Sequence, residues 1–358
     1  MKKFLALLLA LTMALALVAC GGGNDSSNTA TSGGDSESGF EPMTWKFACS
    51  ATETSPWVDG AKEFARIVGE KTGGAITVQY YPADQLTAGS QTDGIQALMD
   101  GTTEISMHSN LIWSSFDQRF NVVSLPFLFS STEEADAALD GAGGEALGEI
   151  LESTYNVHLL GIAENGFRHI TNSKHAIASK ADMNGLKMRV AGSQLLNRSY
   201  ELWGADYTNA NWSEVFTALQ TGTYDGQENP LPTADAASIQ EVQSYLTYWT
   251  GAYDCLFFCM NAELYNSLSP ELQAIVDEAG QAACEYEREL NRSQDQEIMD
   301  KWAEAGVEIT ELTPEAAAEF AEASAPVYDE FADELTPELI EAFTSVTQAD
   351  AGTTEPAA

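Results

Sequence analysis

The chain has 358 residues, a length that favours two domains, and its 44% hydrophobic and 20% charged residues are enough to build packed cores. Acidic residues outnumber basic ones 54 to 16, which gives a formal net charge of −38 at pH 7. Such a surface repels nucleic-acid phosphates and anionic lipid headgroups, so we exclude nucleic acid as a partner.

The first twenty residues have the organisation of a secretion signal. Lys2 and Lys3 precede an apolar run over residues 4–19, which is short for a transmembrane helix. The run ends in Leu-Val-Ala-Cys-Gly, which resembles a bacterial lipobox with Cys20 as the lipidated residue. We predict a lipoprotein signal peptide over residues 1–20; the alternative is an ordinary cleaved signal with an incidental cysteine.

Residues 21–42 are rich in Gly and Ser and nearly free of apolar side chains until position 40. Such a segment cannot offset its own ordering entropy, so we predict a flexible linker. No second apolar run of membrane-spanning length follows it. The expected product is an extracytoplasmic body held at the cell membrane, facing the periplasm or the cell surface, by a lipid on Cys20.

The body begins with alternating strands and helices. Strand patterns over residues 43–49, 75–82 and 103–108 are separated by amphipathic helix patterns over 57–71 and 91–100. This order predicts an open α/β domain with a parallel sheet and right-handed crossovers. Ligands bind to such sheets at the carboxyl ends of the strands.

A second α/β unit and a helical end follow. We predict strands over 157–163, 187–190, 205–208 and 255–260, and helices over 195–203 and 212–221. One helix is predicted over 270–305, with Ser269 as its N-cap and a length of about 50 Å, enough to lie across two lobes. Helices over 313–325 and 336–346 precede a polar tail, residues 348–358.

The four cysteines of the body are too sparse for a disulfide scaffold. Cys255 and Cys259 lie in an apolar run, so burial as small hydrophobic residues is the favoured interpretation. A disulfide that involves Cys49 or Cys284 remains an alternative.

Motifs for catalysis and cofactor binding are missing. The sequence has no nucleophile elbow, zinc-protease, phosphate-loop or EF-hand pattern, and its four histidines are not at metal-ligand spacing. The segment 141–146 matches G-x-G-x-x-A but follows a helical stretch, and we interpret it as a helix–helix turn. We predict no catalytic residues, no metal and no cofactor.

Two of the seven arginines stand outside predicted helices in informative contexts. Arg168 follows Asn-Gly-Phe, and Arg189 lies in the short strand Lys-Met-Arg-Val. A guanidinium can hold a carboxylate through two parallel hydrogen bonds, which makes both residues candidates for binding an organic anion. The alternative for each is a structural ion pair with one of the many acidic residues.

Three motifs in order carry a family resemblance. They are N-G-F-R-H-I-T-N at 165–172, G-L-K-M-R-V at 185–190 and E-V-F-T-A-L-Q-T-G-T-Y-D-G-Q-E-N-P at 214–230. The chain from about residue 44 to 346 resembles the DctP-type solute-binding subunits of tripartite ATP-independent periplasmic (TRAP) transporters. Departures from common family patterns near residues 87–91, 191–192 and 206–209 leave the identity of the ligand open.

The resemblance implies a periplasmic-binding-protein-like fold with a ligand cleft between two lobes. We expect residues 43–166 and 255–294 in the first lobe, and residues 167–254 and 295–347 in the second. The implied ligand contacts are Arg189 as carboxylate clamp, Arg168 and Asn229 as orienting groups and Trp212 as an apolar cover. Trp212 as plain core is the alternative.

Ser109 and Asn110, at the end of the third strand, are the candidate contacts from the first lobe. The predicted function is the capture of a small organic acid and its delivery to TRAP membrane subunits. Two other functions stay open: a binding protein for a different receptor, and an extracytoplasmic enzyme.

Overall fold

The computed structural model describes residues 39–351, with side chains to residue 345. The predicted signal peptide, Cys20, most of the predicted linker and the end of the polar tail lie outside the described residues. Within residues 39–351, the lobes discussed below belong to one compact unit.

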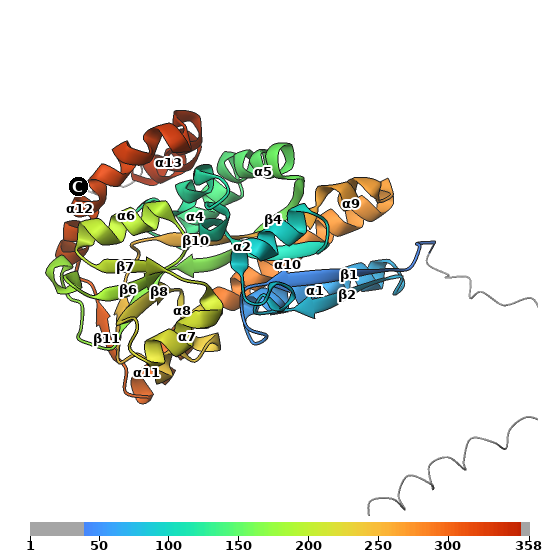
Figure 1. Cartoon of the computed structure of the whole chain (residues 1–358). Helices are drawn as coiled ribbons and strands as arrows, with labels where there is room; N and C mark the ends of the chain where they lie inside the picture. Colours follow the sequence, from blue (N-terminus) through green and yellow to red (C-terminus); the bar gives the residue numbers. More distant parts are fainter. Residues whose placement is uncertain (1–38, 352–358) are drawn as a thin grey trace, which may run out of the picture. The chain divides into compact units, whose positions relative to one another are not determined.

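Figure 1 shows the arrangement of the helices and strands. The strands are β1 (Met43–Cys49), β2 (Ile76–Tyr81), β3 (Ile105–Ser109), β4 (Val157–Phe167), β5 (His169–Asn172), β6 (Lys187–Val190), β7 (Asp206–Asn209), β8 (Gly226–Asn229), β9 (Tyr245–Tyr248), β10 (Tyr253–Asn261) and β11 (Glu308–Glu311). The α-helices are α1 (Pro56–Lys71), α2 (Gln91–Met99), α3 (Asn110–Trp113), α4 (Thr132–Leu139), α5 (Ala142–Tyr155), α6 (Gln194–Trp203), α7 (Trp212–Gln220), α8 (Leu231–Ala236), α9 (Ala262–Ser267), α10 (Pro270–Ser293), α11 (Asp295–Glu304), α12 (Pro314–Leu335) and α13 (Pro337–Ala351).

The sheet of the first lobe has the strand order β2-β1-β3-β10-β4. β1 pairs in parallel with β2 and β3, as the alternation of strands and helices predicts. β10 then enters antiparallel between β3 and β4, so the sheet is mixed and not purely parallel. The reason is topological, because β10 returns to this sheet from the second lobe and no crossover helix joins it to β3.

The sheet of the second lobe has the order β11-β9-β5-β8-β6-β7. β6 pairs in parallel with β7 and β8, whereas β5 pairs antiparallel with β8 and β9. The strand predicted over 187–190 is β6 itself, and the helix predicted over 195–203 is α6, which Ser193 caps through the backbone N–H of Leu196.

Two strand crossings connect the lobes. β4 of the first sheet runs into β5 of the second with only Arg168 between them. In the other direction, four residues separate the end of β9 from the start of β10. The two crossings are tied together where Arg168 N donates to Ala252 O at 2.9 Å. Arg168 therefore stands at the junction of the lobes.

The predicted long helix is two helices in the structure. Ser269 caps α10 as predicted, accepting a hydrogen bond from Leu272 N. The helix ends at Ser293, whose hydroxyl donates back to Leu290 O at 2.8 Å, and α11 begins after Gln294.

The C-terminal helices pack on different lobes. α12 packs on α6 of the second lobe, whereas α13 packs on α4 and α5 of the first. The expected division places residues 295–347 in the second lobe, whereas α13 packs on helices of the first. Phe343 of α13 contributes to this packing, because its ring contacts Phe129 with the ring centroids 6.5 Å apart.

The four cysteines of the body are buried and free, as small core residues. Cys255 and Cys259 lie on β10, which is buried on both faces. Within residues 39–351 no helix is both long and apolar enough to span a membrane.

Candidate ligand-binding site

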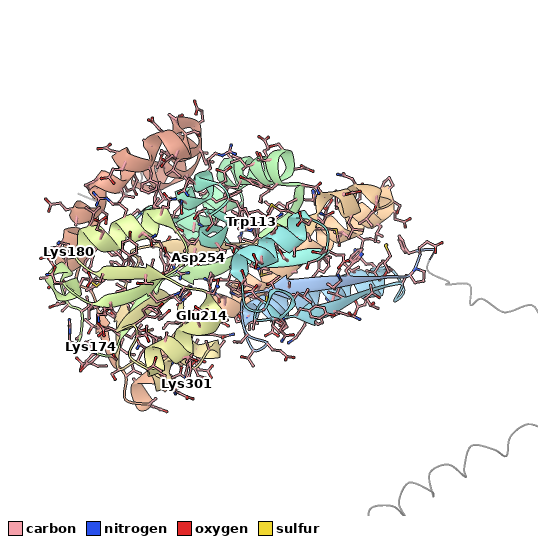
Figure 2. The ribbon with its side chains drawn as sticks, in the orientation of Figure 1. Trp113, Lys174, Lys180, Glu214, Asp254 and Lys301 are labelled. Carbon is pink, nitrogen blue, oxygen red and sulfur yellow. The ribbon has the colours of Figure 1, made fainter. Side chains whose placement is uncertain are left out.

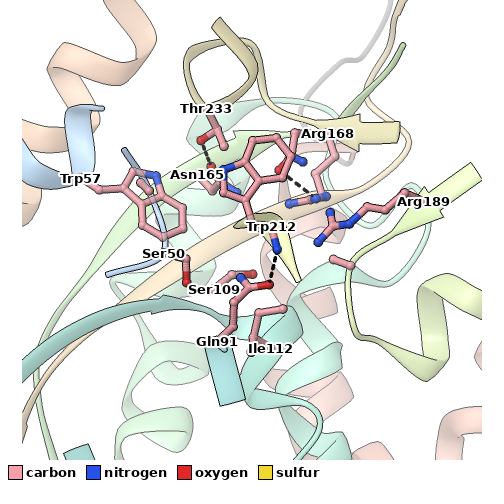
Figure 3. Close-up of a pocket in the computed structure, with 13 residues that line it drawn as sticks. Ser50, Trp57, Gln91, Ser109, Ile112, Asn165, Arg168, Arg189, Trp212 and Thr233 are labelled. Carbon is pink, nitrogen blue, oxygen red and sulfur yellow. Dashed lines mark hydrogen bonds between the residues drawn. The ribbon is translucent and has the colours of Figure 1, made fainter. Parts of the chain in front are cut away.

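A cavity lies between the two lobes and opens to solvent. Figure 3 shows it in close-up. The first lobe contributes Ser50, Trp57, Gln91 and Ser109 to its wall, and the second contributes Arg189, Trp212, Asn229 and Thr233. Asn165 and Arg168, at the crossing, complete the polar part of the lining.

The position of the cavity follows from the topology. Ser50 directly follows β1, Ser109 ends β3, and Asn229 ends β8. Both sheets thus present the carboxyl ends of parallel strands to one cavity, the place where open α/β sheets bind ligands.

Arg189 is the cation of this site. It is 2% exposed, yet among the described residues it forms no ion pair with an acidic side chain, and only Ala210 O accepts from its Nε and Nη2, at 3.0 and 2.7 Å. Burial lowers the pKa of Arg189 to about 10, so the guanidinium stays charged at neutral pH. A buried cation without an anion is costly to a folded protein, and a ligand carboxylate would offset that cost.

Trp212 covers the guanidinium. The first residue of α7, it places its ring with the centroid 5.6 Å from Arg189 Cζ, a cation–π geometry. Its backbone N–H donates to Gln91 Oε1 across the cavity at 3.2 Å. The predicted aromatic cover therefore lines the cavity and also joins the lobes.

Arg168 lines the same cavity, but its charge is already paired. Its Nε and Nη1 donate to Glu228 and Asp254, and its Nη2 donates to Glu228 O at 2.8 Å. Desolvation opposes the charged form, but the two carboxylates outweigh it and raise the pKa of Arg168 above its usual value. The residue fits the structural ion pair that the sequence left as its alternative.

The acidic partners are buried as deeply as Arg168. Asp254 lies in the interior (Figure 2), fully buried, and its burial raises the pKa of its carboxyl against the opposing effect of Arg168. Glu228 Oε1 also accepts from Ala191 N at 3.0 Å and so holds the chain just after β6. Arg168 and Glu228 therefore position the strand that carries Arg189.

Asn229 lines the cavity with an amide that protein atoms already engage. Its Oδ1 accepts from Arg168 Nη2 at 3.0 Å, and its Nδ2 donates to Gln227 Oε1 at 2.8 Å. The second hydrogen on Nδ2 remains for a ligand oxygen. The position agrees with the predicted orienting role.

Ser109 and Asn110, the candidate contacts of the first lobe, point to different environments in the structure. Ser109 lines the cavity and donates to Asp254 Oδ1 at 2.7 Å. Asn110 does not line it, because its amide turns into the first lobe, where Nδ2 donates to Phe120 O and Oδ1 accepts from Cys255 N. The amide of Asn110 therefore stabilises the first lobe and does not face the cavity.

Several lining residues were not predicted from the sequence. Ser50 follows the first strand, and the rule that strand ends carry ligand contacts could have found it. Trp57 stands in the first turn of α1 and looked like an ordinary helix residue. Asn165 begins the motif at 165–172, but its bond to Thr233, at 2.6 Å and 68 residues away, gives no local signal.

The described part of the chain holds no group of three or more His, Cys, Asp or Glu placed to bind a metal ion. Two α/β lobes, two strand crossings and a buried, unpaired arginine between the lobes define a two-lobed solute-binding protein. The site is built to hold an anion and shows no nucleophile activated by a neighbouring base.

Comparison with known proteins agrees with this class. Residues 47–335 match the DctP family, described as bacterial extracellular solute-binding protein, family 7. The chain belongs to this family of TRAP-type solute-binding proteins, which are extracytoplasmic binding proteins and not enzymes. The sequence-based identification of the family and the two-lobed α/β fold are thereby confirmed.

Three relatives illustrate the family. The 2,3-diketo-L-gulonate-binding periplasmic protein YiaO of Escherichia coli is 31% identical over 76% of this chain and 83% of its own. The sugar acid binding protein of Advenella mimigardefordensis, solved with galactonate, has a TM-score of 0.83 at 29% identity over 86% of this chain and 99% of its own. A TRAP periplasmic solute-binding protein of Ralstonia eutropha, solved with (S)-2-acetolactate, has a TM-score of 0.82 at 31% identity over 85% of this chain and 99% of its own.

Proposed function

We propose that this protein captures a small organic acid outside the cytoplasm through an ion pair between the acid's carboxylate and Arg189, and delivers it to TRAP membrane subunits. The observation that carries the proposal is the buried guanidinium of Arg189, which has no acidic partner among the described residues. A bidentate carboxylate would occupy the edge that Ala210 O leaves free. Asn229 would add a hydrogen bond and Trp212 an apolar wall.

The overall charge makes this local cation necessary. With a net charge of −38, the protein repels anions at long range, and Lys174 and Lys301, which Figure 2 shows on the outside, do not line the cavity. Arg189 supplies an unneutralised positive charge inside the cavity. A ligand that binds the closed arrangement better than an open one shifts the population toward closure, and the closed form would be the one that docks on the membrane subunits.

Membrane attachment through Cys20 is the second part of the proposal. It rests on the lipobox-like run before Cys20 and on the Gly/Ser-rich segment that follows. Cys20→Ala is expected to move the protein from the membrane fraction to the soluble fraction of cells. Unchanged membrane association would exclude lipidation of Cys20.

Thermal melting against a panel of organic acids tests the capture function. Galactonate, D-erythronate, pantoate and succinate are suitable probes, because solved relatives hold them. A bound acid at 100 times its dissociation constant adds about 2.7 kcal/mol of stability, which raises the melting midpoint by several degrees.

Two variants control the experiment. Arg189→Ala is expected to lose the shift, and Arg198→Ala to keep it, because Arg198 is paired on the surface of the same lobe with Glu201 and Glu330. A panel without any shift, or shifts that survive in Arg189→Ala, would contradict the proposal.

A further inference from the structure

The cavity holds two buried hydrogen-bonding groups that no protein atom engages. Ser50 and Trp57 are each 4% exposed and line the cavity. Ser50 Oγ and Trp57 Nε1 have no hydrogen-bond partner among the described residues. Leaving such groups unpaired costs about 1–3 kcal/mol each, so two of them in one cavity point to a ligand that engages them.

Their neighbours in the lining are already bonded within the protein. Thr233 donates to Asn165, which in turn donates to Asp254, and Ser109 donates to the other oxygen of Asp254. These side chains form a closed hydrogen-bonded group around one carboxylate. Ser50 and Trp57 stand outside it.

The two groups lie away from Arg189. In Figure 3, Trp57 and Ser50 stand on one side of the cavity and Arg189 on the other, with Trp212 between them in this view. Ser50 and Trp57 come from the first lobe, at the end of β1 and the start of α1, whereas Arg189 comes from β6 of the second. A ligand that reaches both therefore joins the lobes.

The charges of the lining decide what the far end of that ligand can be. The basic residues of the lining are Arg168 and Arg189. Arg168 is already paired with Glu228 and Asp254, and one carboxylate of the ligand would pair with Arg189. A second carboxylate beside Trp57 would be a buried charge without a partner, which is strongly unfavourable.

An indole N–H can only donate, and a serine hydroxyl can donate or accept. We propose that Ser50 and Trp57 form a second subsite that binds a neutral oxygen, hydroxyl or carbonyl, at the end of the ligand remote from its carboxylate. The ligand is then a hydroxy- or oxo-monocarboxylate and not a dicarboxylate. This inference rests on the proposed function, because it takes Arg189 as the carboxylate anchor.

Calorimetric titration with matched acids tests the subsite. Galactonate, galactarate and hexanoate share a six-carbon chain and differ in hydroxyl groups and in the second carboxylate, and D-erythronate, meso-tartrate and butyrate repeat the comparison with four carbons. We expect the protein to bind the hydroxy-monocarboxylate of at least one series about tenfold more tightly than either of its partners. A dicarboxylate that binds as tightly would overturn the inference.

Variants assign the effect to the two residues. Trp57→Phe keeps the ring and removes the N–H, and Ser50→Ala removes the hydroxyl. Each is expected to weaken binding of the hydroxy acid about tenfold and binding of hexanoate or butyrate less than twofold. Trp45→Phe is the matched control, since Trp45 Nε1 is also buried without a partner but does not line the cavity.

The outcomes separate the inference from the function on which it rests. If both variants keep full affinity for the hydroxy acid while Arg189→Ala loses it, the subsite is refuted and the carboxylate clamp stands. If no acid binds in a way that depends on Arg189, the proposed function itself is refuted.

Discussion

Two arginines from neighbouring motifs differ in the partners that the fold gives them. Arg168 pairs with Glu228 and Asp254, which are 60 and 86 residues away in sequence, whereas Arg189 forms no ion pair with an acidic side chain of the described residues. Both are buried, so burial alone does not distinguish a structural arginine from a ligand-binding one. The presence or absence of a carboxylate partner does.

Replacement of each arginine by methionine should separate the two roles. Arg168→Met leaves two buried carboxylates without their cation and should lower the free energy of unfolding by about 3–5 kcal/mol. Arg189→Met removes a cation that has no acidic partner and should cost less than about 1 kcal/mol without ligand. Urea denaturation of the ligand-free variants measures both, and equal losses would contradict this division of roles.

The candidate site was predictable only in part from sequence. Arg189, Trp212 and Asn229 belong to motifs of the family, and all three line the cavity. The pairing of Arg168 was not predictable, because its partners come from other strands. Ser50 and Trp57 show their significance only through burial without a hydrogen-bond partner, which is a property of the folded structure.

Among the elements, those with strong local signals were predicted best. α1 and α10 begin at a serine cap followed by proline, and β6 has the predicted bounds. β5, β8, β9 and β11 were missed, and each of them has only four residues. Gly226–Asn229 is buried along its whole length although it carries glutamine, glutamate and asparagine, since pairing in the sheet and the ion pair with Arg168 decide its conformation.

Short segments at the ends of the elements hold the lobes together. Ser213 Oγ donates to Gly89 O at 3.1 Å, next to the bond between Trp212 N and Gln91. Gly89 has φ +88°, and a Cβ built there would lie 2.6 Å from Ser213 Oγ and 3.0 Å from Ser213 Cβ. The close approach of the lobes therefore requires a glycine at this position.

Gly89→Ala should weaken ligand binding about tenfold, because the added methyl group opposes closure and only the closed arrangement completes the cavity. Gly74→Ala is the matched control, since Gly74 has φ +81° and no atom within 4 Å of a built Cβ. Both variants carry the same kind of backbone strain and should lower the melting midpoint alike. Titration with the acid that the panel identifies measures the affinity, and equal affinities in the two variants would refute a role for Gly89 in closure.

In the whole molecule, the contacts between lobes form a set around the cavity. Thr52 donates to Ala236 O, Ser115 donates to Gly192 O and Ser193 donates to Asn121 Oδ1, at 3.2, 3.1 and 2.7 Å. Thr52 and Gly192 directly follow the lining residues Ala51 and Ala191, so these bonds hold the lobes closed beside the cavity. A protein of net charge −38 thus encloses a guanidinium, that of Arg189, which forms no ion pair with the described residues and which we propose as the anion's anchor.

The most direct test of the carboxylate clamp changes the ligand and the protein together. The tightest acid of the panel and its neutral amide are titrated calorimetrically into the wild-type protein and into Arg189→Met. The account predicts that the amide binds the wild type about 30- to 1000-fold more weakly than the acid, and that this difference largely disappears in Arg189→Met. An amide that binds the wild type as well as the acid, or an acid preference that persists without Arg189, would contradict the account.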